Sequence, residues 1–580
     1  MRTQFKRYRP IPPGRGLFSV TCGALFALFA LLGCTEEIDT PADDEPGARR
    51  DFPGPRPMNG RPNRNKEPNR GSDSVRFSDE VRSFNGVGNN REETEWGAVG
   101  AFLIRLADEA YDDGVGAPSG VDRPNARAIS NTVAAQDEEI PNSAGVSDFV
   151  WQWGQFLDHD ITETPFADPA EEFNIAVPTG DPWFDPFNTG TVEIPLNRSV
   201  YEFVDGVRQQ FNAITAFIDG SAVYGSELER AEALRTLDGT GRLATSDGDL
   251  LPFNTDGEVN VPDDSARYFL AGDVRSNEQV GLTAMHTVFV REHNYWAEMI
   301  SAEDAELTGE QIYQEARAIV TAEMQVITYR EFLPALLGPG ALEPYSGYSA
   351  DINPTISNEF ATASYRLGHS MLSSVLLRLN ADGSEIDGGN IALADAFFNP
   401  EEIVTWGIDP ILRGLAAQEA QEIDTFVVDG VRNFLFGAPG AGGLDLVALN
   451  IQRGRDHGLP SLNEVRTAIG LDMHADFASV NSDPAVQARL AAIYDDVGQI
   501  DLWVGGLAEE HVTGALVGET ILTIVRNEFE RLRDGDRFWY ERYLPAAIVQ
   551  MVEGQTLATI IRRNTDIGDE LQDDVFRVVQ

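Results

Sequence analysis

The 580-residue sequence has little cysteine, lysine or histidine. Its two cysteines, Cys22 and Cys34, and its only lysines, Lys6 and Lys66, lie near the N-terminus, so the rest of the chain has no means of forming a disulfide. HExxH, CxxC and glycine-rich phosphate-loop motifs are missing as well. Their absence excludes zinc proteases, zinc ribbons and nucleotide-binding enzymes.

The charge is strongly negative and unevenly distributed, with a net value of −49. Residues 1–91 carry 15 Lys and Arg against 11 Asp and Glu, a net of +4, which leaves −53 for residues 92–580. This acidity argues against nucleic-acid binding, which calls for a basic face. Two explanations of the acidic, lysine-free surface remain open, namely adaptation to salt and a lineage bias in codon usage.

The N-terminus has the features of an export signal. Basic residues precede an apolar run at residues 17–32, which is shorter than the roughly 20 residues of a membrane-spanning helix. The run ends in "LLGC", which resembles a bacterial lipobox and predicts cleavage before Cys34 and lipidation of its thiol. Residues 1–34 are therefore predicted to be a lipoprotein-type signal peptide, and the alternative is an ordinary signal peptide with an incidental cysteine. We expect an exported protein held at a membrane surface by acyl chains, or an extracellular one.

The remaining sequence divides into a spacer and a domain. Residues 35–79 are rich in Pro, Arg and Asn and predict a disordered spacer. Residues 80–580 contain no repeat or linker and predict one large domain. Their apolar residues follow helical spacing, so we expect a mainly α fold with few short strands. The predicted helices lie at residues 101–110, 282–299, 312–336, 361–379 and 519–532.

Two stretches combine carboxylates with apolar residues. In "WQWGQFLDHD", His159 stands between Asp158 and Asp160, and burying all three groups is costly unless each has a partner. In "NAITAFIDGSAVYGSE", the acidic Asp219 lies in a short run of polar and apolar residues that could form a tight loop binding Ca²⁺ through oxygen atoms. A half-buried polar strand explains the second stretch equally well.

Three further stretches contain candidate polar residues. In "AGDVRSNE", Arg275 and Glu278 lie on one face if the segment is helical, although a surface ion pair is the usual reading. In "SYRLGHS", Arg366 precedes His369 by one turn, and the intervening Gly368 leaves room for a flat group. A lone histidine in such a segment is more often structural. The third, "LNIQRGRDHGLP", is a dense polar cluster in an aliphatic region.

Together, these stretches resemble the animal-type haem peroxidase family of the peroxidase–cyclooxygenase superfamily. The resemblance covers roughly residues 80–575 and also includes "RSFNGVGNN", "MHTVFVREHN", "IDLWVGGLAE" and "RLRDGDRFW", in the family's order. It implies a single domain with haem buried between core helices. By this resemblance His159 is the distal histidine, which takes a proton from H₂O₂ and returns it. Arg275 stabilises the negative charge that develops on oxygen, and Gln155 positions water or a halide.

The resemblance also assigns the cofactors. Asp158 and Glu278 correspond to carboxylates that form esters with a b-type haem. His369 corresponds to the proximal iron ligand and Asn450 to the residue that orients it. The expected partners of the haem propionates are Arg366 and Arg453. The expected Ca²⁺ ligands are Asp160, Thr215, Phe217 through its carbonyl, Asp219 and Ser221.

The expected reaction is the H₂O₂-dependent oxidation of halides, thiocyanate or small organic donors. Gln279 stands where the member best known for oxidising chloride has a methionine bonded to the haem, so we expect bromide, iodide or thiocyanate rather than chloride. One alternative is a fatty-acid dioxygenase of the same superfamily. Such enzymes need a tyrosine three residues before the proximal histidine, where this chain has Arg366, and Tyr365 lies one place too early. The other alternative is a non-enzymatic surface adhesion lipoprotein.

Overall fold

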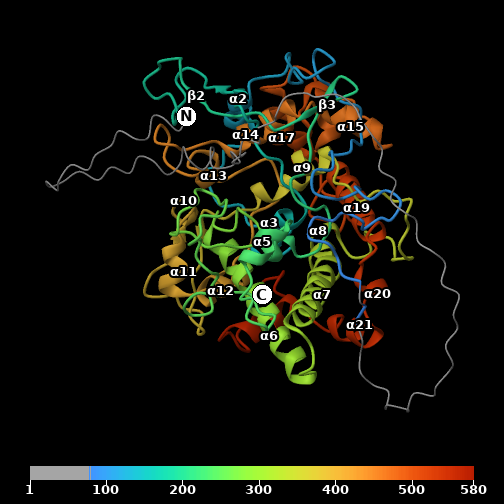
Figure 1. Cartoon of the computed structure of the whole chain (residues 1–580). Helices are drawn as coiled ribbons and strands as arrows, with labels where there is room; N and C mark the ends of the chain where they lie inside the picture. Colours follow the sequence, from blue (N-terminus) through green and yellow to red (C-terminus); the bar gives the residue numbers. More distant parts are fainter. Residues whose placement is uncertain (1–76, 79, 580) are drawn as a thin grey trace, which may run out of the picture.

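Long helices at the centre of the molecule form from the apolar stretches of the sequence. Helix α6 (Val280–Glu303) begins at Gln279, whose side chain accepts a hydrogen bond from the Gly281 backbone. Helix α7 (Gly309–Ile327) begins with a capping box and packs against α6 (Figure 1). It continues through a π-helical turn, η2 (Thr328–Phe332), into α8 (Leu333–Leu337).

The computed structural model describes residues 77–78 and 80–579. The predicted signal peptide with Cys34 and almost all of the predicted spacer lie outside these residues. The other helical elements are α2 (Ala126–Val133), α3 (Phe149–Ile161), α4 (Ser221–Tyr224), α5 (Leu228–Ala233), α9 (Asn358–Thr362), η3 (Ser364–Ser370), α10 (Leu393–Ala396), α11 (Pro400–Trp406), α12 (Asp409–Ala417), α13 (Asp429–Arg432), α14 (Leu446–Asp456), α15 (Leu462–Ala468), α16 (Phe477–Val480), α17 (Pro484–Ala491), η4 (Val497–Gln499), α18 (Leu502–Ala508), α19 (Glu519–Asp534), α20 (Tyr540–Tyr543), α21 (Ala546–Val552) and α22 (Leu557–Asn564).

The strands are few and short, as expected. In the part of the chain that the structure describes, they form three separate antiparallel pairs, β1 (Ile175–Ala176) with β2 (Glu193–Ile194), β3 (Glu202–Val204) with β4 (Val207–Gln209), and β5 (Val375–Leu376) with β6 (Ile391–Ala392). Within the described residues, no helix is long and apolar enough to cross a membrane.

Three of the predicted helices are confirmed, and two predictions are wrong. Residues 282–299, 312–336 and 519–532 lie in α6, in α7 to α8 and in α19. Residues 101–110 are extended instead, because Phe102 bridges Phe211 and Ile104 bridges Ser357. Residues 361–379 form the end of α9, the 3-10 segment η3 and strand β5. Pairing with distant segments replaces the helix that the local pattern favours.

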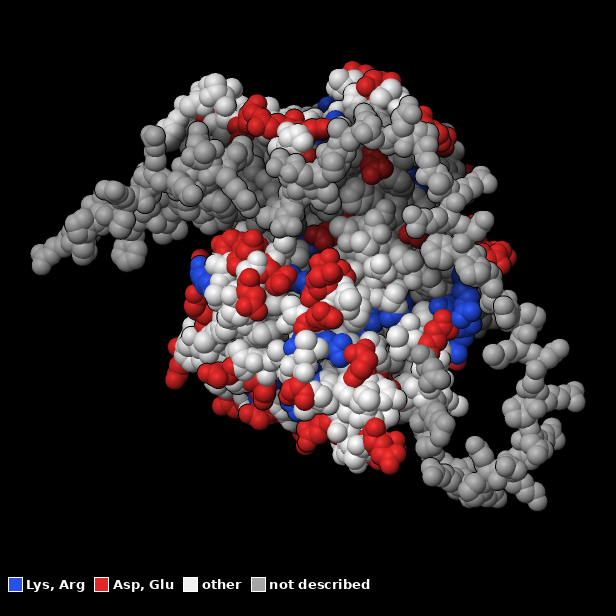
Figure 2. All heavy atoms as spheres, viewed as in Figure 1, with Lys and Arg blue, Asp and Glu red and all other residues white. Residues whose placement is uncertain are grey.

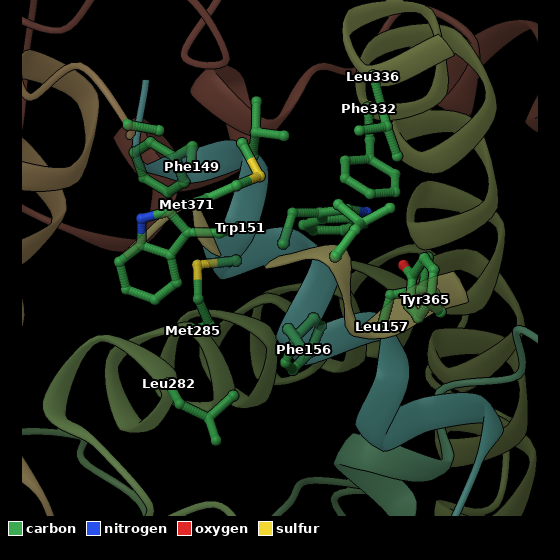
Figure 3. Packing of buried hydrophobic residues seen from close by; sticks show 14 of the residues in the cluster. Phe149, Trp151, Phe156, Leu157, Leu282, Met285, Phe332, Leu336, Tyr365 and Met371 are labelled. Atoms are coloured by element: carbon green, nitrogen blue, oxygen red, sulfur yellow. The ribbon is translucent and has the colours of Figure 1, made fainter. Parts of the chain in front are cut away.

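The core is built around α3, which packs against α6. Phe156 of α3 stacks on Phe289 of α6, with ring centroids 5.1 Å apart. Trp151, Leu157 and Phe332 belong to the same hydrophobic cluster as Phe156 (Figure 3). This packing fixes α3 along most of its length, so the polar residues in its last turns are held in place.

The surface agrees with the acidic composition. Acidic side chains are spread over the face shown in Figure 2, with fewer basic ones between them. This distribution fits the net charge of −49. It fits both explanations of the acidity that the sequence left open.

Candidate active site

One cavity of about 380 Å³ brings together most of the predicted site residues. Helix α3 and the segment before α6 form one wall, while η3 and α14 form the other. The predicted residues that line the first wall are Gln155, Asp158, His159, Arg275 and Glu278, and those that line the second are Arg366, His369, Asn450 and Arg453. The volume lies within the range of small-molecule and cofactor sites.

His159 lies in the last turn of α3 and is almost completely buried. Its Nδ1 is 3.5 Å from Oδ1 of Asp273, and its Nε2 is 3.7 Å from Oε2 of Glu278, which also lines the cavity. Burial and the nearby positive charge of Arg275 lower the pKa of His159 well below its usual value. The imidazole is therefore neutral near pH 7 and able to accept a proton.

Arg275 is held by a carboxylate that the sequence analysis did not identify. Both oxygens of Asp273 accept hydrogen bonds from its guanidinium, at 2.9 Å from Nε and 2.8 Å from Nη2. A third bond runs from Nη2 to the Thr162 carbonyl, and Nη1 is 3.8 Å from Asp158. The segment is a turn rather than a helix, and Arg275 pairs with Asp273, although Arg275 and Glu278 both line the cavity. The spacing "DxR" within a stretch already singled out was the available signal.

Glutamine side chains join α3 to the start of α6. Gln155 donates to Glu278 at 3.1 Å, and Gln279 donates to Gln155 at 3.1 Å and to Gln152 at 2.6 Å. The side-chain oxygen Oε1 of Gln279 accepts a hydrogen bond from the Gly281 N–H at 2.6 Å. Gln279 is thus fully engaged at the cavity wall, at the position where the sequence analysis noted the absence of methionine.

The two predicted ester carboxyls, Asp158 and Glu278, both face the cavity. Enclosure by protein raises the pKa of Asp158 to about 6 and that of Glu278 to about 7, and the charge of Arg275 opposes both shifts. Each carboxyl is costly to ionise in this enclosed position. An ester would remove the charge, so both residues fit a covalently attached cofactor.

His369 lies on the opposite wall, in η3. Three residues make one turn of a 3-10 helix, so Arg366 and His369 lie on the same face. Nδ2 of Asn450 is 2.7 Å from Nδ1 of His369, and its Oδ1 accepts from Arg366 at 3.2 Å. Burial lowers the pKa of His369 to about 3, so its Nε2 is left as a neutral nitrogen for a metal. A side chain at Gly368 would meet only Trp151, at 3.9 Å, so this wall is open to a flat group.

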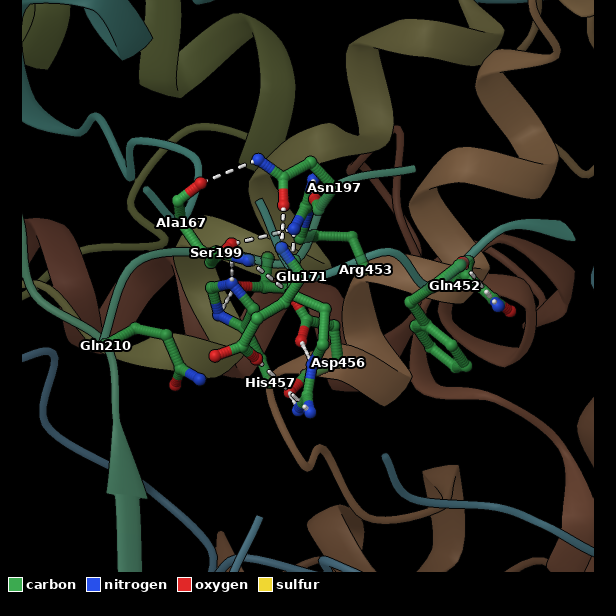
Figure 4. A network of polar contacts seen from close by, with 12 residues as sticks. Ala167, Glu171, Asn197, Ser199, Gln210, Gln452, Arg453, Asp456 and His457 are labelled. Atoms are coloured by element: carbon green, nitrogen blue, oxygen red, sulfur yellow. Dashed lines mark hydrogen bonds and ion pairs between the residues drawn. The ribbon is translucent and has the colours of Figure 1, made fainter. Parts of the chain in front are cut away.

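Arg453 reaches the cavity from a buried polar network that the sequence analysis missed (Figure 4). It donates to Ser199 at 2.9 Å, to Asp456 at 2.8 Å and to the Asn197 carbonyl at 2.9 Å. His457 bonds to the same Ser199 at 2.7 Å. The stretch "LNIQRGRDHGLP" therefore contributes one arginine to the cavity and a network that fixes its position.

The predicted calcium residues lie together where the last turn of α3 meets the loop that leads into α4, and none of them lines the cavity. Asp160 and Asp219 are completely buried, and Asp160 accepts hydrogen bonds from the backbone of Asp219 at 3.1 Å and of Ala222 at 2.8 Å. Thr215 donates to Asp219 at 3.1 Å, and Ser221 donates to the Asp160 carbonyl at 2.7 Å. In the described chain, Oδ2 of Asp219 has no hydrogen-bond partner.

This loop has the chemistry of a hard-cation site. Burial, and then repulsion from Asp219, raises the pKa of Asp160 to about 8. The carbonyls of Thr215 and Phe217 accept no hydrogen bond from any described residue. Among the described residues no three His, Cys, Asp or Glu side chains cluster as metal ligands, so a cation here would use two carboxylates with hydroxyl and carbonyl oxygens. The unpartnered carboxylate oxygen fits such an ion.

The chain is similar to known proteins over most of its length. The family model for animal haem peroxidase matches residues 81–576. The chain belongs to the animal haem peroxidase family. It is a haem-dependent oxidoreductase of the peroxidase class, and the mainly α, single-domain fold that the sequence predicted is confirmed.

The curated relatives differ in how much of their length this chain spans. Peroxinectin A of Dictyostelium discoideum is 36% identical over 85% of this chain and 95% of its own length. The peroxidasin homolog pxn-2 of Caenorhabditis elegans is 36% identical over 85% of this chain, which spans 42% of that protein. Thyroid peroxidase of Sus scrofa is 35% identical over 85% of this chain and 60% of its own length.

Solved structures share this fold over most of the chain. Peroxidase A of Dictyostelium discoideum matches with a TM-score of 0.79 and 34% identity, over 86% of this chain and all of that one. The fatty acid alpha-dioxygenase of Oryza sativa, solved with palmitic acid, matches with a TM-score of 0.73 and 22% identity over 86% of this chain and 87% of its own. The second likeness shows a shared fold only.

Proposed function

We propose that this peroxidase uses H₂O₂ to oxidise small donors at a haem held between His159 and His369. One observation carries the proposal. The two histidines, both neutral, lie on opposite walls of one cavity, with Arg275 fixed beside His159. When bound there, the haem supplies the redox chemistry, and the protein supplies position, charge and access.

The residues of the first wall act on the peroxide. His159 accepts a proton from H₂O₂ at Nε2 and returns it to the departing oxygen, a base and then an acid role that its low pKa permits. Arg275, oriented by Asp273, stabilises the negative charge that develops on oxygen. Gln155 holds water or the donor next to these groups.

The residues of the second wall hold the cofactor. His369 would hold the haem iron through Nε2, and its Nδ1–H would then donate a hydrogen bond to the amide oxygen of Asn450. The nitrogen and oxygen of an amide are assigned from their hydrogen bonds, so the Asn450 amide can be turned to place its oxygen at His369. Turning the amide would break the hydrogen bond that Arg366 donates to Asn450. Arg366 and Arg453 are then the partners of the haem propionates. Asp158 and Glu278 would form the ester links, and Asp160 with Asp219, Thr215, Phe217 and Ser221 would hold Ca²⁺.

For the donor, we propose bromide, iodide, thiocyanate or a small organic molecule rather than chloride. Gln279 supports this choice, because its amide is engaged with Gln152, Gln155 and Gly281 and offers no sulfur to the haem. The dioxygenase alternative lacks such support. Arg366 occupies the position that its tyrosine would need, although Tyr365 lines the same cavity.

For localisation, we propose an exported protein, lipidated at Cys34 and tethered to a membrane surface by its acyl chains. The support is the "LLGC" motif and the long polar stretch between it and residue 80. Mass spectrometry of the mature N-terminus tests this proposal. A free Cys34 thiol would contradict it.

The haem proposal is tested by the absorption spectrum and by extraction of the cofactor. The haem- and calcium-loaded protein is treated with acidified solvent before and after H₂O₂ is added. A Soret band with haem that resists extraction after peroxide is the expected result. Haem that remains extractable would remove the ester roles of Asp158 and Glu278, and failure of the folded protein to bind haem would overturn the proposed site.

A further inference from the structure

A row of aromatic rings leaves the cavity beside His369. Tyr365 lines the cavity four residues before His369, and its hydroxyl has no hydrogen-bond partner in the described chain. Its ring meets Phe529 of α19 at a centroid distance of 5.8 Å, and Phe529 meets Tyr329 of η2 at 6.0 Å. Both distances are those of contacting aromatic rings.

The row continues away from the cavity into α20. Tyr329 meets Trp539 at 4.8 Å, and Trp539 meets Tyr540 at 4.9 Å. Arg330 and Glu553 form an ion pair over the Tyr540 hydroxyl, and their side chains are 46% and 32% exposed. Trp539 and Tyr540 are each only 3% exposed, so the row runs from the cavity to a point one side chain below the surface, under Arg330 and Glu553 near α20 and α21 (Figure 1).

The π-helical turn η2 gives the row its geometry. It holds Phe332 at the cavity, Tyr329 between Phe529 and Trp539, and Arg330 at the Tyr540 hydroxyl. The five residues of η2 thus contact both the cavity, through Phe332, and Tyr540, through Arg330. Such π-helical insertions in α-helices occur frequently at functional sites.

Among the described residues, the side chains of the row that donate hydrogen bonds to carboxylates lie at its outer end. The Tyr540 hydroxyl donates to the Glu553 carboxylate at 3.3 Å, and Nε1 of Trp539 donates to the Glu541 carboxylate at 3.3 Å. The Tyr329 hydroxyl donates to the Phe529 backbone carbonyl, which is a poor proton acceptor. An oxidised phenol must lose its proton to persist as a neutral radical, so an oxidising equivalent would settle at Tyr540.

We propose that this row conducts electrons from Tyr540 to the haem and so creates a second site of oxidation, at the surface, for phenols too large to enter the cavity. The inference rests on the proposed function, because H₂O₂ at the haem is the oxidant. Tyr540 gives one electron toward the haem and its phenolic proton to Glu553. The external phenol then gives one electron to the Tyr540 radical and releases its proton to water, while Glu553 returns the phenolic proton and so restores Tyr540. Each H₂O₂ is reduced to two waters as two phenols become two phenoxyl radicals.

The test compares two donors and three variants of the haem-loaded protein. The small donor is p-cresol, and the large donor is tyramine coupled to dextran. The variants are Tyr540→Phe, Trp539→Phe and the matched control Tyr543→Phe, which alters the same helix outside the row. Rapid-freeze electron paramagnetic resonance after one equivalent of H₂O₂ supplies a readout independent of turnover.

We expect a narrow tyrosyl signal in the native protein and in Tyr543→Phe, and a signal at least tenfold smaller in Tyr540→Phe. Oxidation of dextran-tyramine should fall at least tenfold in Tyr540→Phe and Trp539→Phe, with the p-cresol rate unchanged. Dextran-tyramine oxidation at the control rate in Tyr540→Phe, with normal p-cresol turnover, would overturn the surface site alone. A native protein that binds haem but neither oxidises p-cresol nor forms a radical would overturn the proposed function, and the surface site with it.

Discussion

Asp273 binds Arg275 through both carboxylate oxygens, at 2.9 and 2.8 Å, and also lies 3.5 Å from Nδ1 of His159. One buried carboxylate thus orients Arg275 and faces the imidazole of His159, the two groups proposed to act on peroxide. Asp273→Asn should slow the reaction of the haem-loaded protein with H₂O₂ about 100-fold, the cost of a misplaced catalytic group. Stopped-flow absorption at the Soret band measures this rate. The exposed Asp256→Asn is the matched control, and equal rates in the two variants would remove the positioning role.

The pH dependence of the same reaction follows from the environment of His159. Burial and Arg275 lower its pKa, so the imidazole stays neutral as pH falls through about 6.5, where an ordinary histidine gains its proton. The rate with H₂O₂ should therefore stay constant from pH 8 to below 6.5 and decrease only in more acidic solution. A decrease centred at an ordinary histidine pKa, and absent in His159→Gln, would show that the folded protein does not lower this pKa.

The sequence predicted the parts of this site that depend on local pattern. Helix α6 was recognisable because apolar residues continue over its length, and Asp158, His159 and Asp160 drew attention because their burial needs partners. The partnership of Asp273 with Arg275 is local but depends on the shape of a turn, which has no periodic pattern. The extended course of residues 101–110 depends on pairing with segments more than a hundred positions away. Distant contacts of this kind leave no periodic signal in the chain.

The contact between Asn450 and His369 predicts a change in the cofactor itself. Asn450→Leu removes the partner of Nδ1 and should weaken haem binding or activity by about 10- to 100-fold, as loss of a partner of a metal-binding histidine typically does. It should also shift the reduction potential of the bound haem, which spectroelectrochemistry measures. Asn463→Leu, on α15 outside the cavity lining, is the control. An unchanged potential in Asn450→Leu would argue against this contact in the holoprotein.

Loss of a buried arginine should lower the free energy of unfolding more than loss of a surface arginine. Arg127 is completely buried and pairs with Asp181 at 2.8 Å and Asp445 at 2.7 Å. Arg127→Met leaves both carboxylates unpaired and should lower the free energy of unfolding by about 3–5 kcal/mol. Arg267→Met breaks the exposed pair with Glu401 and should cost less than about 1 kcal/mol. Denaturant unfolding of the two variants checks the difference.

The buried pair of Asp160 and Asp219 predicts a stability that depends on both calcium and pH. Burial raises the pKa of both carboxyls, to about 8 for Asp160, whereas an unfolded aspartate has a pKa of about 3.9. After chelation, the contribution of the protonated carboxyls is fully present below about pH 3.9 and is lost as pH rises toward 8. Differential scanning calorimetry with a chelator should therefore show a melting temperature that decreases over this interval.

Calcium should abolish that decrease, because it stabilises the ionised carboxylates. At roughly 1,000 times its Kd, calcium should add about 4 kcal/mol to the free energy of unfolding. Asp219→Asn removes one charge and the unpartnered oxygen, so it should weaken this response while leaving the cavity lining intact. Asp264→Asn, at an exposed carboxyl, is the control. An identical calcium response in both variants would show that the ion binds elsewhere.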